Sequence, residues 1–261
     1  MLLALDVGNT ETTVGLFQAD RLVGHWRLTT TTARTPDEWA ALLSAYLTNA
    51  GHSPSGVRAA VVASVAPLVT QSVCEGVNAL TGVTPVLVDA RSQLPISLDV
   101  DEPLTVGADR VVNTLAAMRL FERDTIVVDF GTATTFDCIT ADGRFIGGVI
   151  MPGIRTASDE LVRRTTKLPA TELTPPERVI GRRTEDCIRS GVLWGTADAV
   201  DGLIRRIREE WPAPGGVRPF VVATGGLAPL VAPLTQEIET VQPDLTLVGL
   251  RLAAEALGLG W

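Results

Sequence analysis

Residues 2–13 read LLALDVGNTETT, and no other stretch says as much about the fold. A short apolar run of strand length ends in Asp6, and Gly8 follows two positions later. Residues 13–17 and 22–28 then alternate as two paired strands would around a turn at residues 19–20. The start of the chain therefore predicts a three-stranded antiparallel meander whose first strand ends in a carboxylate beside a glycine turn.

The same pattern starts again in the second half of the chain. Residues 125–135 read TIVVDFGTATT, again a short apolar run that ends in an aspartate and is followed by a glycine. Aligning residues 6–10 with residues 129–133 also brings the two later hairpin turns into register, given small gaps. Duplication of a strand, hairpin and helix unit predicts two α/β lobes facing each other across a cleft.

Further helices and strands are expected in both halves from the spacing of apolar residues and from glycine and proline stops. In the first half we expect helices at residues 36–50 and 67–80 and strands at 59–63 and 86–88. In the second half we expect strands at residues 135–139, 145–151 and 219–223 and helices at 154–164, 184–210 and 250–257. We place the N-terminal lobe at residues 1–118 and the C-terminal lobe at residues 119–261.

The composition argues against several classes of function. A formal net charge of −8 over 261 residues disfavours nucleic acid, whose binding needs clustered Lys and Arg. The cysteines are few and widely spaced, which supports neither a disulfide framework nor a zinc knuckle. Asp6 interrupts the first apolar run too early for a signal peptide, and no apolar run of about 18 residues follows. We therefore expect a cytoplasmic protein with no nucleic-acid and no membrane partner.

The two acidic strand ends are candidate phosphate sites. A glycine directly after a strand lets the backbone approach an anion, and nearby Asn and Thr side chains can donate hydrogen bonds to phosphate oxygens. A carboxylate at such a position can also hold a divalent cation, usually through water. Either copy alone is equally consistent with an ordinary hairpin turn stabilised by Asp and Asn. Two copies in duplicated lobes favour a site for the phosphates of a nucleotide.

Two further motifs carry candidate chemistry. Residues 224–226, Thr-Gly-Gly, follow an expected strand and would let the backbone lie close to adenine or phosphate, although a plain strand-to-helix turn has the same spacing. Residues 107–110, Gly-Ala-Asp-Arg, precede an apolar helical stretch. An aspartate in the first turn of a helix is also explained by helix initiation alone, because the helix dipole favours negative charge there.

Together these motifs resemble the phosphate and adenosine motifs of the actin, sugar kinase and heat-shock ATPase superfamily, over nearly the whole chain. Within that superfamily the chain is similar to the type III pantothenate kinases, through DxGNT at residues 6–10, GADR at 107–110, DxGTATT at 129–135 and GGxIxPG at 147–153. The resemblance implies an α/β fold of duplicated ribonuclease H-like (actin-like ATPase) lobes. Each lobe would have a mixed sheet with a three-stranded antiparallel meander, with a cleft between the lobes.

The resemblance also implies roles for individual residues. The ATP phosphates would be bound by Thr132 and by the whole first turn, namely Asp6, Val7, Gly8, Asn9, Thr10, Glu11, Thr12 and Thr13. Asp129 would hold a monovalent cation, potassium or ammonium. Magnesium would accompany ATP, with Asp6 as its possible protein contact, through water.

The substrate implied by the resemblance is pantothenate, and its site would be formed by Val100, Gly107, Ala108, Asp109 and Arg110. Asp109 would accept the proton of the pantothenate hydroxyl as that hydroxyl attacks the γ-phosphate, which agrees with the need of phosphoryl transfer for a carboxylate that orients the nucleophile.

A homodimer is implied as well, in which Thr184 from the neighbouring subunit reaches the substrate. Two residues depart from the family pattern. Arg183 stands where the family commonly has asparagine, and Val100 stands where many relatives carry a tyrosine that lines the substrate pocket.

The implied activity is ATP-dependent phosphorylation of pantothenate to 4'-phosphopantothenate, the first step of coenzyme A biosynthesis. Two alternatives stay open, a phosphotransferase acting on another small alcohol and a nucleotide-binding accessory or regulatory protein of the same fold. The joint presence of Asp6, Asp109 and Asp129 favours an enzyme, because a binding module does not need a catalytic base.

Overall fold

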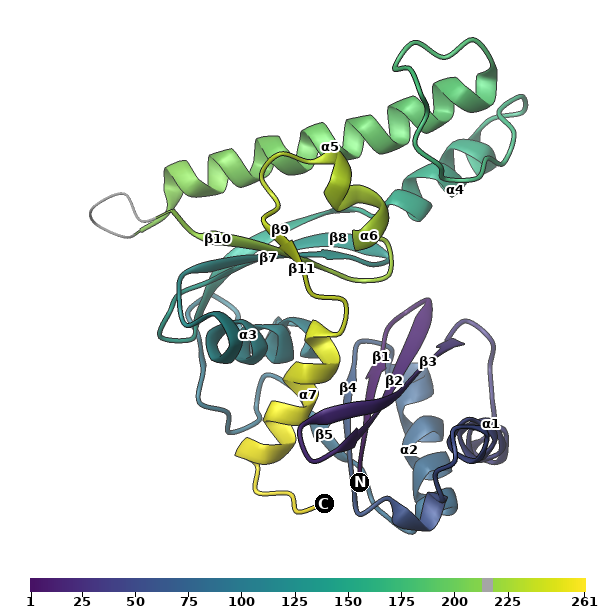
Figure 1. The fold of residues 1–261 in the computed structure, drawn as a ribbon, viewed down its shortest axis with the longest axis vertical. Helices are drawn as coiled ribbons and strands as arrows, with labels where there is room; N and C mark the ends of the chain where they lie inside the picture. Colours follow the sequence, from purple (N-terminus) through teal and green to yellow (C-terminus); the bar gives the residue numbers. More distant parts are fainter. Residues whose placement is uncertain (213–217) are drawn as a thin grey trace. The chain divides into compact units, whose positions relative to one another are not determined.

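The structure is a computed structural model that describes residues 1–212 and 218–261, and its contacts divide the chain into two compact units (Figure 1). Unit 1 comprises Met1–Leu120, Gly143–Phe145 and Leu245–Trp261, and unit 2 comprises Phe121–Asp142 and Ile146–Asp244. The contacts therefore group residues 245–261 with the N-terminal sheet. The lobes expected from the sequence place these residues in the C-terminal lobe instead.

Unit 1 is built on a five-stranded mixed sheet. Its strands, in the order β3-β2-β1-β4-β5, are β1 (Leu2–Val7), β2 (Glu11–Gln18), β3 (Arg21–Thr29), β4 (Ala59–Ser64) and β5 (Val86–Val88). The first three strands pair antiparallel in sequence order, while β4 is parallel to β1 and β5 is parallel to β4. The predicted three-stranded meander and mixed sheet are confirmed.

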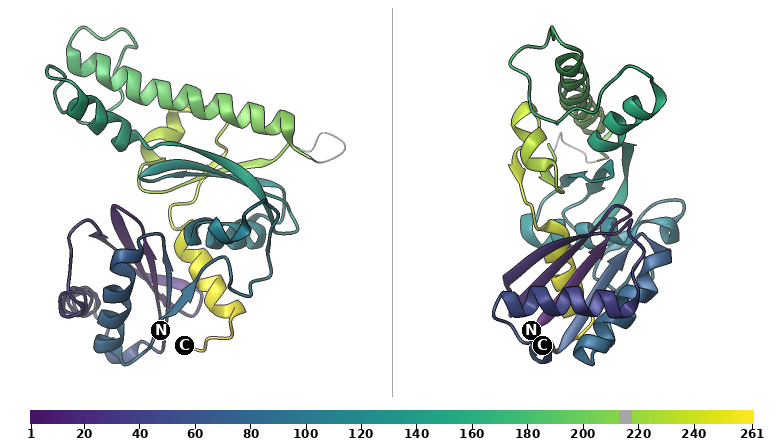
Figure 2. Two further views of the ribbon diagram at one scale, coloured as in Figure 1. Left: turned by 180° about the vertical axis from the view of Figure 1, so that it is seen from behind. Right: turned by 90° about the vertical axis from the view of Figure 1, so that its right-hand side faces the viewer.

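Helices cover both faces of this sheet. They are α1 (Pro36–Asn49), α2 (Pro67–Thr81), α3 (Ala108–Phe121) and α7 (Leu245–Ala256). Because successive residues of a strand point to opposite faces, the apolar run of β1 serves two cores. Leu3 and Leu5 pack with residues of α1 and α2, whereas Leu2 and Ala4 pack with residues of α3 and α7. The left view of Figure 2 shows the strands of unit 1 between α1 and α2 on one side and α7 on the other.

Unit 2 repeats the plan with another sheet, in the order β11-β10-β7-β8-β9. Its strands are β7 (Thr125–Phe130), β8 (Ala133–Ile139), β9 (Arg144–Pro152), β10 (Phe220–Thr224) and β11 (Thr240–Val241). β8 is antiparallel to β7, and β10 and β11 continue the sheet in parallel. The short strand β6 (Ser97–Leu98) pairs with Arg144 and Phe145, the first residues of β9, which group with unit 1.

One face of the second sheet is covered by α4 (Ile154–Arg164), α5 (Thr184–Glu210) and α6 (Ala228–Val231). Ile126 and Val128 of β7 form a core with Val192 and Ile204 of α5. Figure 1 shows α5 as the long helix that runs along this sheet. At 27 residues it matches the helix predicted at residues 184–210.

The elements that the sequence did not predict are short. They are β6, α6, β11 and three 3₁₀ turns at Pro54–Gly56, Pro103–Thr105 and Ala232–Leu234. A segment of two to four residues carries little periodic signal, although the three-residue strand β5 was predicted from its unbroken apolar run. The last helix was predicted too short, since it begins at Leu245 and not at residue 250. Among the helices of residues 1–212 and 218–261, none is long and apolar enough to span a bilayer.

Candidate active site

The first acidic strand end forms a tight turn between β1 and β2. The Gly8 N–H donates to the Glu11 carbonyl over 3.1 Å, and a Cβ on Gly8 would lie 2.8 Å from that same oxygen. Asn9, Thr10 and Glu11 are exposed on the turn. Thr12 is buried, and its hydroxyl shares a 2.8 Å hydrogen bond with the hydroxyl of Thr30. The turn therefore presents three residues to solvent, while Thr12 anchors it inside the fold.

The second acidic strand end also forms a tight turn, between β7 and β8, which is one residue shorter than the first. The Gly131 N–H donates to the Ala133 carbonyl over 3.0 Å. Helix α4 holds the carbonyl group of Thr132, which lies within this turn. The Thr156 hydroxyl donates to the Thr132 carbonyl oxygen over 2.7 Å. A Cβ on Gly153, the residue before α4, would lie 2.2 Å from that oxygen. Gly153 belongs to the GGxIxPG motif, and its place explains why the motif ends in glycine.

The third glycine motif lies directly against Asp129. β10 runs parallel to β7, and Thr224 is paired with Asp129 in that ladder. Gly225 follows with φ of +89°, a conformation that favours glycine, and a Cβ on it would lie 2.3 Å from Asp129 Oδ1. The structure thus brings the expected adenosine motif into contact with the residue expected to hold a cation.

The Gly-Ala-Asp-Arg motif forms the start of α3. Asp109 lies in the first turn of the helix, and its Oδ1 accepts a hydrogen bond of 2.8 Å from the Arg110 N–H. A Cβ on Gly107 would lie 2.5 Å from Asp109 Oδ1, so Gly107 leaves room for the carboxylate. Asp109 thus lies where it can favour the start of the helix, and it is also the candidate catalytic residue.

The pKa of Asp109 is raised above the ordinary aspartate value. Burial of the carboxylate is the main cause, and it outweighs the hydrogen bond from the Arg110 N–H and the positive charge of Arg110, both of which lower the pKa. Desolvation makes the ionised form a stronger base than an exposed aspartate. A titratable group with a pKa shifted in this direction is typical of a general base.

Val100 follows the short strand β6 and is partly buried. The preceding residue is fixed by β9, because the Asp99 N–H donates to the Phe145 carbonyl over 2.8 Å. Phe145 was not singled out from the sequence, because an apolar residue in a strand is typical of a core position. Its ring lies under the guanidinium of Arg110, with 4.9 Å between Arg110 Cζ and the ring centroid.

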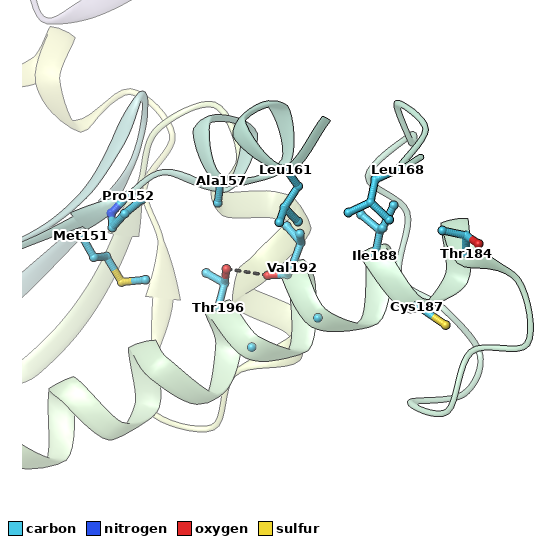
Figure 3. Close-up of a pocket in the computed structure, with 12 residues that line it drawn as sticks. Met151, Pro152, Ala157, Leu161, Leu168, Thr184, Cys187, Ile188, Val192 and Thr196 are labelled. Atoms are coloured by element: carbon cyan, nitrogen blue, oxygen red, sulfur yellow. Dashed lines mark hydrogen bonds between the residues drawn. The ribbon is translucent and has the colours of Figure 1, made fainter. Parts of the chain in front are cut away.

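Thr184 is the first residue of α5, and Arg183 precedes it without a side-chain hydrogen bond that caps the helix. Thr184 lies at one end of a hollow of about 670 Å³ between α4 and α5 (Figure 3). Apolar side chains form most of its lining, among them Met151, Leu161 and Ile188. Gly191 and Gly195 leave the surface of α5 open there, since a Cβ on either would meet no atom within 4 Å.

Carboxylates are spread singly over these turns. Among residues 1–212 and 218–261, no group of three or more His, Cys, Asp or Glu side chains is placed to hold a metal ion. Single carboxylates such as Asp6 and Asp129 suit a monovalent cation, or a magnesium ion carried by phosphates and water. The cation sites expected at Asp6 and Asp129 therefore stay predictions.

The family model described as type III pantothenate kinase matches residues 2–206 of this chain. The chain belongs to the type III pantothenate kinase family. A type III pantothenate kinase from Thermomicrobium roseum is 43% identical over 257 residues, which cover 98% of both proteins. The resemblance carried by the four sequence motifs is thereby confirmed, and the chain is a kinase of this family.

Solved structures of other proteins share the fold. An activator of 2-hydroxyisocaproyl-CoA dehydratase from Clostridium difficile, with bound ADPNP, superposes with a TM-score of 0.57 at 13% identity, covering 99% of this chain and 93% of that one. A ROK hexokinase from Thermus thermophilus superposes with a TM-score of 0.50 at 14% identity, covering 97% of both chains. The predicted fold class, the actin-like ATPase fold of the sugar kinases, is confirmed for this family member.

Proposed function

We propose that this protein phosphorylates pantothenate with ATP and so forms 4'-phosphopantothenate, the first step of coenzyme A biosynthesis. Membership of the type III pantothenate kinase family supports the substrate. The observation that carries the mechanism is the Asp109 carboxylate at the start of α3, in the space left by Gly107 and with a pKa raised by burial.

Asp109 acts as the general base. Its carboxylate takes the proton of the pantothenate hydroxyl, the hydroxyl oxygen forms a bond to the γ-phosphorus of ATP, and the bond to the bridging oxygen breaks to release ADP. In phosphoryl transfer the protein mainly positions the reactants and stabilises charge, and a carboxylate that orients the nucleophile and accepts its proton is one part of this. Arg110, with Gly107, Ala108 and Val100, binds pantothenate beside this base.

The glycine turns bind the phosphates of ATP. Asn9 and Thr10 lie exposed on the first turn, where side-chain and backbone donors can meet phosphate oxygens. In the second turn Thr132 is held by α4 through the Thr156 hydroxyl. The role of Thr12 is to anchor the first turn, since its hydroxyl is paired with that of Thr30.

Asp129 would hold a potassium or ammonium ion, and Asp6 would contact, through water, the magnesium ion that accompanies ATP. These cations supply charge neutralisation for the phosphates when they are bound. Gly225 leaves room for the Asp129 carboxylate, since a Cβ on it would lie 2.3 Å from Asp129 Oδ1. The support for this assignment is the donor chemistry of single carboxylates beside glycine turns.

The protein acts as a homodimer, in which Thr184 contributes to the substrate site of the neighbouring subunit. The apolar hollow along α4 and α5 supports a contact with a second copy there, because exposed apolar surface of this kind favours association. Ile180 and Val179 add apolar area near the start of α5, at 85% and 65% exposure. Gly195→Glu places a charge in the hollow and is expected to give monomers in sedimentation experiments.

The deciding experiment measures ATP consumption by the purified protein with magnesium, with and without pantothenate, in sodium, potassium and ammonium buffers. Turnover that needs both pantothenate and potassium or ammonium is expected. Turnover stimulated by another alcohol and not by pantothenate would assign a different phosphotransferase activity. Nucleotide binding without any turnover would assign an accessory role.

A further inference from the structure

We propose that Phe145 is a positioning residue for pantothenate, with its ring holding the guanidinium of Arg110 and its backbone holding the segment that carries Val100. The proposal rests on the proposed function, since it assigns a role toward the same substrate. All the contacts that support it lie within unit 1.

The ring of Phe145 is buried, whereas the other residues of strand β9 are partly or fully exposed. Of the nine residues of β9, all of them in the described part of the chain, Phe145 alone is buried, with 2% exposure. None of the three apolar clusters formed by the described residues includes it. The ring is thus buried outside these clusters, and the guanidinium of Arg110 lies over its face.

The contact with Arg110 has the geometry of a cation–π interaction. Arg110 Cζ lies 4.9 Å from the Phe145 ring centroid, inside the limit of about 6 Å for such pairs. Arg110 is partly buried, so water competes less for the guanidinium than at an exposed site. A guanidinium stacked on a ring keeps its N–H donors in its own plane, where they can be directed at a carboxylate or a hydroxyl.

The backbone of Phe145 holds a second part of the same site. Its carbonyl accepts from the Asp99 N–H over 2.8 Å, and the Ser97 N–H donates to the Gly143 carbonyl over 3.1 Å. Arg144 adds an ion pair of 3.6 Å to the Asp99 carboxylate. The residue that precedes Val100 is thereby fixed to the strand residue that supports Arg110.

Of Val100 and Arg110, Arg110 is the more important for recognising polar groups of the substrate. Val100 offers no side-chain hydrogen-bonding group, so its contribution to the site is shape. Arg110 carries the charge that a substrate carboxylate or hydroxyl would meet. Loss of the ring under Arg110 should therefore weaken substrate binding with little effect on the chemical step.

The test compares Phe145→Met, which keeps side-chain bulk without a ring, with Phe145→Tyr, which keeps the ring. KM is measured separately for pantothenate and for ATP, together with kcat and Tm. We expect Phe145→Met to raise the KM for pantothenate ~5- to 30-fold, in line with the strength of a partly buried cation–π pair. We expect the KM for ATP to stay within about 3-fold, and Phe145→Tyr to restore the wild-type KM for pantothenate within a similar factor.

A general structural role would give a different pattern. Equal increases in both KM values, or an unchanged KM for pantothenate, would overturn the proposal. So would an equally large effect of Phe145→Met in an Arg110→Ala background, since two residues that act together must be non-additive.

A second variant separates the ring's charge distribution from its shape. Trifluorophenylalanine at position 145 keeps the shape of the ring and weakens its negative face, so the KM for pantothenate should rise while Tm stays unchanged. An unchanged KM in this variant would also contradict the proposal. Wild-type protein without pantothenate turnover would refute the proposed function itself, whereas active wild type with insensitive variants refutes only the role of Phe145.

Discussion

A methyl group on Gly225 would lie 2.3 Å from Oδ1 of Asp129, far inside van der Waals contact. The same methyl group would lie 2.8 Å from the backbone nitrogen of Phe130, so it has no space to move into on that side. The third glycine motif and the second acidic strand end are therefore one packed unit, and a change in the first must displace the second.

Gly225→Ala is expected to displace the Asp129 carboxylate, lower kcat and raise the potassium concentration needed for half-maximal activity. The matched control is Gly82→Ala at the end of α2, where φ is +72° and a Cβ would meet no atom within 4 Å. Both variants carry the strain of a positive φ, about 1–2 kcal/mol, but only Gly225→Ala crowds Asp129. The measurement is the ATP turnover rate of both variants as a function of potassium concentration. The same potassium dependence in both variants would contradict the prediction.

Asp109→Asn is expected to fold normally and to lower kcat by roughly 10²- to 10⁴-fold, the usual contribution of a general base. The Arg110 N–H can still donate to the amide oxygen of Asn, so the helix start is preserved. Asp37→Asn is the control, since Asp37 also lies in the first turn of a helix, α1, but is exposed. Steady-state kinetics of both variants test this, and near-normal turnover of Asp109→Asn would remove Asp109 from its role.

The raised pKa of Asp109 also predicts a dependence of stability on pH. Because burial raises the pKa of Asp109 in the folded state, ionisation costs more in the folded than in the unfolded protein. The cost is absent at a pH below the unfolded pKa of about 3.9, grows as pH rises toward the folded pKa, and is complete above it.

Asp109→Asn should therefore have a higher Tm than wild type at pH 8, and the difference should shrink as pH falls toward 4. Thermal melts of both proteins at several pH values measure this difference. A Tm difference that is constant with pH, or that grows toward acid pH, would show that burial does not penalise the carboxylate.

Gly249→Ala is expected to destabilise unit 1 by about 1–3 kcal/mol, the usual cost of overpacking. A Cβ on Gly249, in α7, would lie 2.2 Å from the Val112 carbonyl oxygen in α3, so the two helices must separate. Gly202→Ala in α5 is the control, because a Cβ there meets no atom within 4 Å, and it should gain about 0.5–1 kcal/mol from helix propensity. The free energy of unfolding of both variants, measured by denaturant unfolding, tests this prediction. Equal values would argue against close packing of α3 and α7.

Local patterns were sufficient for the elements that carry the motifs. The apolar run before Asp6 predicted β1 and its turn, and helical spacing predicted α5 at Thr184–Glu210. The start of α7 was missed, because residues 245–249 include Gly249, which weakens a helix signal. Its helical form comes from packing against α3 and the first sheet, where Leu245 and Leu247 are fully or almost fully buried.

The sequence alone was enough to predict the acidic strand ends, the glycine turns and the family, because a short apolar run, a carboxylate and a glycine in succession are local features and here occur twice. Only the folded chain brings Gly225 against Asp129 and the ring of Phe145 against Arg110, and only there does burial raise the pKa of Asp109. Each of these properties depends on which buried faces meet and on how much water they exclude, and distant segments of the chain contribute to that burial.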